Sequence, residues 1–391
     1  MGHREKNAER EANGAWQTKG MIKEEITLEV TVGKKPVEDI KPPVTQVGVI
    51  GWIRTNLFKG WFNSLLTIIA IYCLWVIVPP LIRWAFIDSL WLSTGAECQQ
   101  SDGACWSIIP ANIRFITFGF FPYDQQWRPL LAMVLLIGLL FYSRNRKHWK
   151  KSLLYAWLVG LFVMGTLMKG GIFGLSSVDT SQWGGLPLTL LLSVFGLTAA
   201  YPLGVVMALG RRSKMQAVKM LCILYIELIR GVPLISLLFM SSVVFPLFLP
   251  QGITINNILR AQVAIILFTA AYIAEVVRGG LQAIPRGQYE AADSIGLSYY
   301  LTMRLVILPQ ALKIVIPPTV QQLISAFKDT SLVVIIALFD LLRTTQTVLS
   351  DPKWMGFSAE AYIFVALIYF LCCFFMSNYS RRLEKELQTD Y

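Results

Sequence analysis

Long apolar runs separated by short polar segments dominate this chain. A helix needs about 20 apolar residues to cross the hydrocarbon core of a bilayer. Eight runs approach or exceed this length, near 62–87, 128–143, 152–169, 185–209, 216–249, 260–280, 307–328 and 360–379. The pattern predicts an all-α integral membrane protein with about eight transmembrane helices.

The fifth run is interrupted at Arg230-Gly231-Val232-Pro233. Proline has no backbone N–H and breaks a helix in its interior. A broken backbone at membrane depth is tolerated only where protein or a water-filled cavity satisfies the freed polar groups. We therefore expect this break to lie against protein or a polar cavity.

The composition supports a membrane protein and argues against a nucleic-acid-binding one. Hydrophobic residues make up 55% of the chain and charged residues only 15%, with a formal net charge of +11. A basic excess in a soluble protein would suggest nucleic acid. Here the basic residues gather in short segments between apolar runs, and no polar segment interleaves them with aromatics as a nucleic-acid groove would. We expect no nucleic-acid partner.

Basic residues follow alternate apolar runs, which predicts the orientation of the chain. They are Arg144, Arg146, Lys147, Lys150, Lys151, Arg211, Arg212, Lys214, Lys219, Arg381, Arg382 and Lys385. Such segments remain in the cytoplasm. The polar segment 1–57 falls on the same side and begins with no apolar signal sequence. Both termini are predicted to be cytoplasmic, with 1–57 as a tail.

Two cysteines lie in the polar segment that this orientation places outside. Cys98 and Cys105 flank a glycine-containing stretch between the first and second runs. In an oxidising compartment such a pair can close a small disulfide ring. The alternative is two unrelated thiols, so the disulfide is a candidate.

A polar stretch after the sixth run carries the most informative motif. It contains Glu290-Ala291-Ala292-Asp293, then Gly296, and ends at Leu308-Pro309. Pro285 restricts the helix start and Gly296 permits a sharp turn, so we expect two short helices at an angle on the cytoplasmic face. The spacing resembles the "EAA" loop of binding-protein-dependent ABC importer permeases, with Val306 where isoleucine is usual. The resemblance implies a coupling helix that docks in an ATPase subunit through Glu290, Ala291, Ala292, Asp293 and Gly296.

Further segments narrow the resemblance to the permeases of polar amino-acid importers, the histidine/glutamine class. These segments are 185–190, 225–234, 271–280 and 328–332, and the resemblance covers about residues 185 to 385. With its three additional apolar runs, the chain is similar to the larger of two permeases in general L-amino-acid importers. The predicted domains are the tail 1–57, an extension 58–175 and a permease core 176–391, whose five helices carry the coupling helix.

The resemblance implies a complete assembly in the bacterial inner membrane. The expected partners are a second permease in a heterodimer, an ATPase dimer, a periplasmic amino-acid-binding protein and an amino-acid substrate. The two halves of this chain show no internal repeat, and many transporters pair two related halves around one pathway. A second subunit is therefore expected to complete the pathway.

Ionisable residues within apolar runs are candidates for that pathway, because such residues usually face a bundle interior or a cavity. Glu227 and Arg230 are three apart, as are Glu275 and Arg278, so each pair shares a helix face. Lys328-Asp329 forms a third group. A zwitterionic substrate needs both signs of charge, whereas structural ion pairs or snorkelling groups would look the same in sequence.

Motifs for catalysis are missing from the sequence. Gly33-Lys34-Lys35 lacks the upstream glycine and following hydroxyl of a phosphate-binding loop, and the two histidines, His3 and His148, are far apart. We expect a transport subunit without enzymatic activity and without its own cofactor, with ATP and Mg²⁺ on the ATPase partner. Two alternatives stay open: a secondary permease driven by an ion gradient, and a membrane scaffold that anchors a soluble enzyme.

Overall fold

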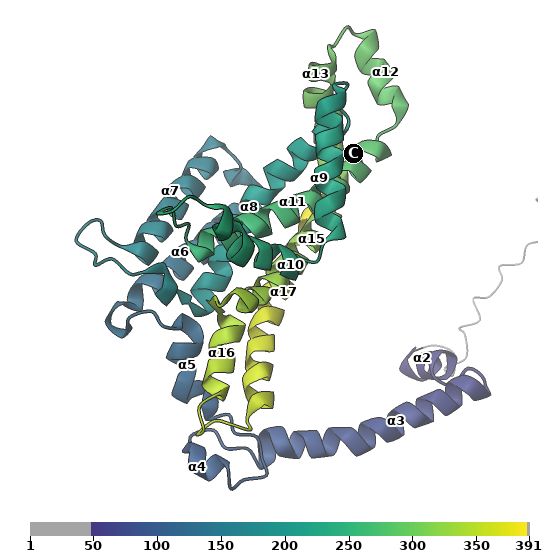
Figure 1. Cartoon of the computed structure of the whole chain (residues 1–391). Coiled ribbons are helices and arrows are strands. Elements are labelled where there is room, and N and C mark those ends of the chain that lie inside the picture. The colour runs from purple at the N-terminus through teal and green to yellow at the C-terminus, as the bar shows by residue number, and fades with distance from the viewer. Residues whose placement is uncertain (1–47, 389–391) are drawn as a thin grey trace, which may run out of the picture. The chain divides into compact units, whose positions relative to one another are not determined.

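The computed structural model describes residues 48–388 and forms two compact units, Met1–Ile82 and Arg83–Tyr391 (Figure 1). Residues 1–47 of the predicted tail 1–57 therefore lie outside the described residues. In the first unit, α2 (Gly48–Asn56) precedes α3 (Trp61–Ile82). None of the residues of α3 is buried. A helix that is apolar all round is suited to contact lipid.

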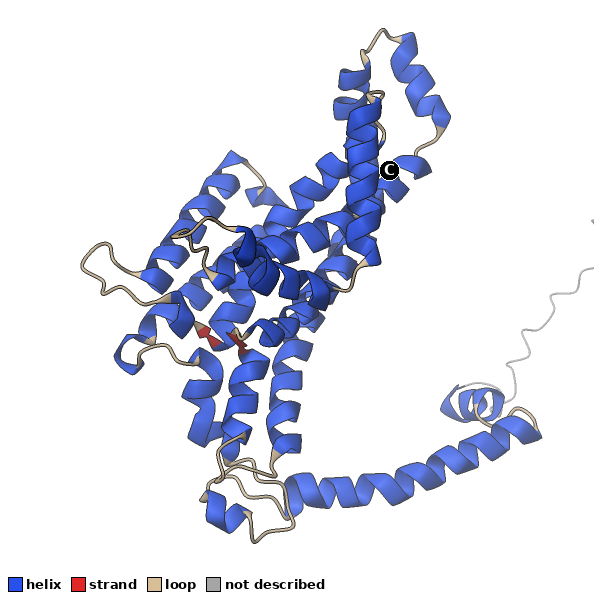
Figure 2. Ribbon diagram, viewed as in Figure 1, coloured by secondary structure: helices blue, strands red, loops and turns tan. Residues whose placement is uncertain are grey.

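The second unit is built almost wholly of helices (Figure 2). Its first α-helices are α4 (Gly95–Cys98), α5 (Ile108–Phe118), α6 (Trp127–Ser143), α7 (Lys151–Lys169), α8 (Gly185–Arg211), α9 (Gln216–Gly231), α10 (Leu234–Phe239) and α11 (Asn257–Ala283). They are followed by α12 (Arg286–Ser294), α13 (Tyr299–Leu301), α14 (Leu308–Ile314), α15 (Ile316–Asp329), β1 (Phe339–Asp340), α16 (Leu341–Leu349) and α17 (Ser358–Gln388). Shorter 3-10 helices cover Tyr123–Gln125, Arg146–His148, Thr180–Gln182, Phe245–Phe248 and Thr330–Ile336, and π-helical turns cover Arg83–Ile87, Met240–Val244 and Thr302–Ile307.

The number of membrane-spanning segments agrees with the predicted fold class. Within residues 48–388, six helices are long and apolar enough to cross a membrane, and two bent pairs raise the number to eight. The prediction of an all-α integral membrane protein is confirmed.

The bend predicted in the fifth run is large. The segments Gln216–Gly231 and Leu234–Phe248 meet at 106°. Val232 is extended, with φ −109° and ψ 133°, and Pro233 precedes α10. The ring of a proline disfavours helical geometry at the preceding residue, so the helix ends there and a new one starts in another direction.

The seventh span starts earlier than its apolar run does. The run begins near residue 307, whereas the bent span Tyr299–Ile314 and Ile316–Ile336 begins with α13. The second of the two short helices expected after Pro285 is therefore the first turn of this span. The polar and aromatic residues at the start of this span precede the apolar run. Hydropathy alone therefore placed the start of the seventh span too late.

The centre of the second unit is the packing of α8 on α11. Small residues recur every fourth position on the buried face of α8: Gly196, Ala200, Gly204 and Ala208. A Cβ added at Gly204 would lie 2.8 Å from the carbonyl oxygen of Ala270 on α11. Small residues at this spacing let two membrane helices approach closely.

The segment predicted as an external loop contains helices of its own. In it, α5 packs against α8, α16 and α17. Ile108 and Ile116 of α5 are fully buried beside Leu341 and Val348 of α16. Parallel bridges join Gly184 to Phe339 and Gly185 to Asp340. Because these contacts link residues far apart in sequence, the extension and the core share one hydrophobic cluster.

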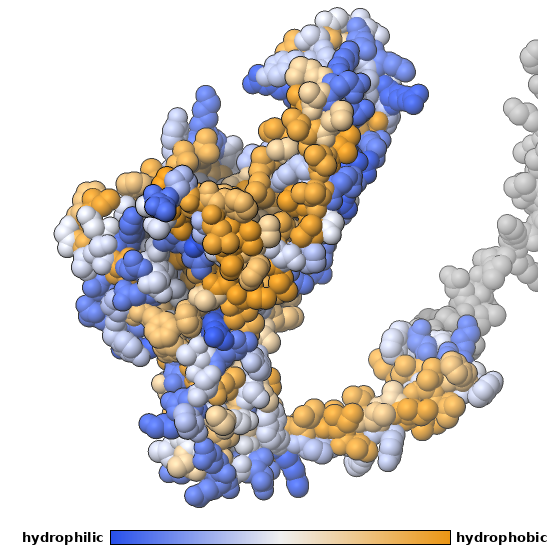
Figure 3. Space-filling view, in the orientation of Figure 1, coloured by the Kyte–Doolittle hydropathy of each residue, from blue (hydrophilic) through white to orange (hydrophobic). Residues whose placement is uncertain are grey.

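Hydrophobic side chains cover the middle of the second unit in the view of Figure 3, and hydrophilic ones gather around α12. We call the end with α12 and α13 the α12 end. The opposite end, formed by α4, α5 and α16, is called the disulfide end (Figure 1).

Candidate functional site

The helix α12 stands out from the α12 end as an exposed element (Figure 1). Glu290, Ala291 and Asp293 are exposed, and Ala292 is the one residue of α12 that is buried. Pro285 at its N-cap is extended, with φ −58° and ψ 143°, which separates α12 from α11. The sequence therefore presents both acidic side chains to solvent on a short separate helix.

Gly296 ends α12 in a left-handed conformation, with φ +77°. The N–H of Gly296 donates to the carbonyl of Asp293 at 2.9 Å, and that of Leu297 donates to Ala292 at 3.1 Å. These two bonds form a Schellman motif, which glycine favours because it has no Cβ. The sharp turn expected at Gly296 is present, and it directs the chain back toward the membrane span.

Few side chains hold α12 to the rest of the chain. Arg212 Nη1 donates to the carbonyl of Leu281 at 3.2 Å and to the hydroxyl of Tyr289 at 3.1 Å. Gln310 Nε2 donates to Gln288 Oε1 at 3.0 Å. The end of α8 therefore contacts both α11 and α12, so a displacement of α12 would act on α8 and α11.

A cluster of five ionisable side chains joins α8, α9 and α11. We call it the charge cluster; it consists of Arg211, Glu227, Arg230, Glu275 and Arg278. Arg211 Nη1 lies 2.9 Å from Glu227 Oε1 and 3.4 Å from Glu275 Oε2. Arg278 donates to Glu275 through both Nε and Nη2. The cluster thus ties together three helices that are distant in sequence.

The structure changes the pairing that helix spacing suggested. Glu275 and Arg278 do pair within α11. Glu227 pairs with Arg211 of α8, and the described part of the chain shows no ion pair between Glu227 and its neighbour Arg230. From the sequence, Arg211 was assigned only to a basic cytoplasmic segment. Its ion-pair partners come from other helices, so no local spacing reveals them.

Lys328 and Asp329 lie elsewhere. They end α15, where Lys328 is exposed and Asp329 is half-buried. Among residues 48–388 no ion pair connects them with the charge cluster. The six candidate pathway residues are therefore divided between two places.

At the disulfide end, Cys98 and Cys105 are fully buried and joined by a disulfide, with their Cα atoms 5.6 Å apart. The N–H of Cys105 donates to Glu360 Oε1 at 2.9 Å. Gln99 Nε2 donates to the carbonyl of Pro352 at 3.2 Å. The ring is therefore attached to the start of α17 and to the loop before it.

Asp340 is a second buried carboxylate at this end and was not anticipated from the sequence. Its Oδ1 accepts from the N–H of Arg343 at 2.9 Å and caps α16. Its side chain is fully buried, and burial raises the pKa of Asp340 to about 6. Aspartate before an apolar helix is a recognisable N-cap signal, but its burial depends on packing against other elements.

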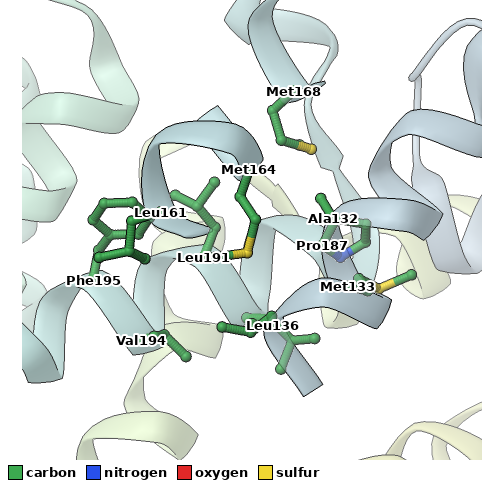
Figure 4. A pocket seen from close by; sticks show the side chains of 11 residues that line it. Ala132, Met133, Leu136, Leu161, Met164, Met168, Pro187, Leu191, Val194 and Phe195 are labelled. Carbon is green, nitrogen blue, oxygen red and sulfur yellow. The ribbon is translucent and has the colours of Figure 1, made fainter. Parts of the chain in front are cut away.

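An apolar pocket lies between α6, α7 and α8 (Figure 4). Met133, Met164, Met168 and Phe195 line it, with no ionisable residue among the lining side chains. A zwitterion would lose its hydration there without compensation, so this pocket does not suit an amino acid. No group of residues that could hold a metal ion occurs between residues 48 and 388.

The chain is similar to known transport proteins over most of its length. It is 51% identical to the inner membrane amino-acid ABC transporter permease protein YhdY of Escherichia coli (strain K12), over 86% of this chain and 93% of that protein. It belongs to the amino-acid ABC transporter permeases. The permease is also 39% identical to the glutamate/glutamine/aspartate/asparagine transport system permease protein BztC of Rhodobacter capsulatus, over 89% of this chain and 96% of that protein.

Shorter relatives indicate which part of the permease is shared more widely. Residues 200–389 match the family of binding-protein-dependent transport system inner membrane components. The probable glutamine ABC transporter permease protein GlnM of Bacillus subtilis is 37% identical over 52% of this chain and 91% of its own length. The matched family region lies within the predicted core 176–391 and contains α12 and all members of the charge cluster. The domain boundary at residue 175 stays a prediction.

Proposed function

We propose that this permease forms one half of an amino-acid pathway whose other half is a second, different permease. An ATPase dimer docks at α12 and holds ATP and Mg²⁺, and this chain hydrolyses nothing. A periplasmic amino-acid-binding protein delivers the substrate. Support comes from the family membership, and from the relatives whose names specify amino-acid transport.

The exposed helix α12 is the observation that carries this proposal. It presents Glu290 and Asp293 beside Ile295, whose exposed fraction is 75%. An acidic helix that ends in an apolar tip is suited to a cleft with a basic rim and an apolar floor. The few contacts between α12 and the other helices leave most of its surface available to a partner.

The mechanism is alternating access driven by the ATPase. Closing of the ATPase dimer moves α12 as a rigid element, and the contacts of Arg212 pass this motion to α8 and α11. Helices that pivot together in this way open the pathway toward one side of the membrane, and hydrolysis resets them. Both termini and α12 are cytoplasmic in this proposal, and the disulfide end lies in the oxidising periplasm.

Reconstitution in proteoliposomes tests the proposal. Proteoliposomes that hold this permease, its companion permease, the ATPase and the binding protein should take up amino acid only when ATP is present on the side of the membrane where the ATPase lies. Leaving out either the companion or the ATPase should abolish uptake. Uptake by this chain alone, or uptake that follows an ion gradient without ATP, would contradict the proposal.

Docking at α12 has a separate test. Glu290→Lys reverses a charge on the exposed face, and close charge pairs across interfaces couple strongly. The variant should insert and assemble with the companion permease but capture less ATPase in a pull-down. Glu386→Lys, which alters an exposed ion pair on α17, is the matched control and should capture the normal amount.

A further inference from the structure

The charge cluster is not electrically balanced. Its ion pairs involve three guanidinium groups and two carboxylates, which leaves a net charge of +1. The five side chains are partly buried, with exposed fractions between 21% and 55%. Charges within membrane helices are usually paired or face a functional cavity. The excess positive charge therefore favours binding of an anion.

Arg230 is the member whose guanidinium is least engaged. Glu227 is paired with Arg211, and Glu275 accepts two hydrogen bonds from Arg278. Arg230 reaches Glu275 only at 3.7 Å, beyond hydrogen-bond distance. Its Nε is buried and has no hydrogen-bond partner among the described residues. A guanidinium carries five N–H donors, so Arg230 has donors left for a ligand.

The surroundings of Arg230 suit a carboxylate ligand. It lies directly before the break between α9 and α10, where the chain turns by 106°. Irregular backbone at membrane depth occurs where protein or a polar cavity satisfies it. The guanidinium lies over the ring of Tyr272, 5.5 Å from its centroid. This contact holds the planar group in one orientation, which favours bidentate binding of a carboxylate.

We propose that Arg230 binds a carboxylate of the transported amino acid, and that the net positive charge of the cluster favours substrates with acidic side chains. This inference rests on the proposed function, because it requires that amino acids pass through the permease. Glu227, the most exposed member of the cluster at 55%, accepts a hydrogen bond from the ammonium group of the same ligand in this proposal. Cationic amino acids are disfavoured by the same charge.

The test compares aspartate with asparagine, which are nearly equal in shape and differ by one negative charge. Binding of each labelled amino acid is measured by equilibrium dialysis on the permease pair with its ATPase in nanodiscs, without the binding protein. The quantity of interest is the ratio of the two dissociation constants. Loss of fold or expression affects both ligands equally, so the ratio isolates the effect of charge.

Two variants change the cluster charge in opposite directions. Glu227→Gln raises it and should increase the preference for aspartate, whereas Arg230→Gln neutralises it and should reduce that preference. We expect a change of roughly three- to tenfold in each direction for one charge near the ligand. Arg382→Gln, which removes an exposed arginine paired with Glu386 on α17, is the control and should leave the ratio unchanged.

An unchanged ratio in both cluster variants would overturn the inference, as would a wild-type complex that binds neither amino acid. Should Arg230→Gln fail to assemble, Glu227→Gln decides alone, since Glu227 takes part in a single ion pair within residues 48–388. Uptake by the full complex with its binding protein is measured in parallel. ATP-dependent uptake with an unchanged ratio would refute the role of Arg230 while the proposed function stands.

Discussion

The two ends of the second unit differ in how deeply their polar side chains are buried. At the disulfide end, Glu360, Asp340 and Thr344 have exposed fractions of 3% or less, and each forms a hydrogen bond with a residue of another segment: Cys105, Tyr369 and Ile116, respectively. At the α12 end, the charge cluster is partly exposed and α12 is held by a few surface contacts. The same helix, α8, runs from one end to the other. One end is thus packed like a protein interior, and at the other a short exposed helix makes few contacts with the remaining helices.

Under the proposed function, the disulfide end contributes mainly to stability and the α12 end to coupling with the ATPase. Dense packing of α5 on α8 resists local opening, because every shift there would leave a buried polar group without its partner. Exposed contacts such as that of Arg212 with Tyr289 contribute little to stability, but they can still transmit a displacement. Four variants probe this contrast, arranged by the expected size of the effect on the free energy of unfolding.

The largest loss is expected for Gly185→Ala at the start of α8. Gly185 has φ +64°, and a Cβ there would lie 2.0 Å from the carbonyl oxygen of Thr117 in α5. Overpacking and a strained left-handed residue together should destabilise the protein by about 2–5 kcal/mol. The midpoint of thermal denaturation in detergent measures this effect. Gly279→Ala in α11, where a Cβ would meet no atom within 4 Å, is the control, and equal midpoints for both variants would contradict the close packing of α5 on α8.

Removal of the disulfide should have the next largest effect. Opening the ring between Cys98 and Cys105 with paired serines should cost about 2–4 kcal/mol, because the unfolded chain regains conformational freedom. Cys73→Ser, at an exposed position of α3, should leave the midpoint unchanged. Mass-tagging under denaturing, non-reducing conditions should find Cys98 and Cys105 blocked, and two reactive thiols there would refute the bond.

Asp340 should make stability depend on pH. Burial raises its pKa to about 6, whereas the unfolded value is about 3.9. Between these values the folded protein binds more protons than the unfolded chain, so this residue's contribution to stability falls as the pH rises from about 4 to 6. The change should be about 2–3 kcal/mol.

The comparison is with Asp340→Asn, which keeps the N-cap but cannot ionise. The denaturation midpoint of the wild type, relative to this variant, should be higher at pH 4 than at pH 7. Parallel pH profiles for the two proteins would show that Asp340 does not titrate in this range.

Gly296→Val should have the smallest effect on stability and a large one on transport. Its left-handed conformation is strained for any residue with a Cβ, by about 1–2 kcal/mol, but nothing lies within 4 Å of that position. The α12 turn should therefore shift while the remainder of the fold stays intact. ATP-dependent uptake should be lost at matched expression. Gly287→Val in α12 is the control, because a Cβ there also meets no atom within 4 Å and the residue has no positive φ. Normal uptake by Gly296→Val together with reduced uptake by Gly287→Val would contradict the expectation.

Much of this architecture followed from local patterns in the sequence. The apolar runs predicted the spans because a helix in lipid satisfies its own backbone, so that length and hydropathy are sufficient. Pro233 predicted the bend after α9, and Gly296 predicted the turn after α12, since each residue acts through its own backbone dihedrals. The motif around Glu290 predicted the family, because its residue types and spacing resemble the "EAA" loop of ABC importer permeases.

Contacts between distant residues needed the tertiary structure. Helix spacing pointed to Glu227 and Arg230 as neighbours, but Glu227 pairs with Arg211 because α8 and α9 lie side by side. The segment that holds Cys98 and Cys105 was predicted as an external polar segment, yet one face of α5 is buried in it because α16 and α17 supply the opposing apolar surface. The buried state of Asp340 arises in the same way. Local sequence determines the backbone dihedrals and which face of a helix is apolar, whereas ion pairs and burial depend on which helices pack against each other.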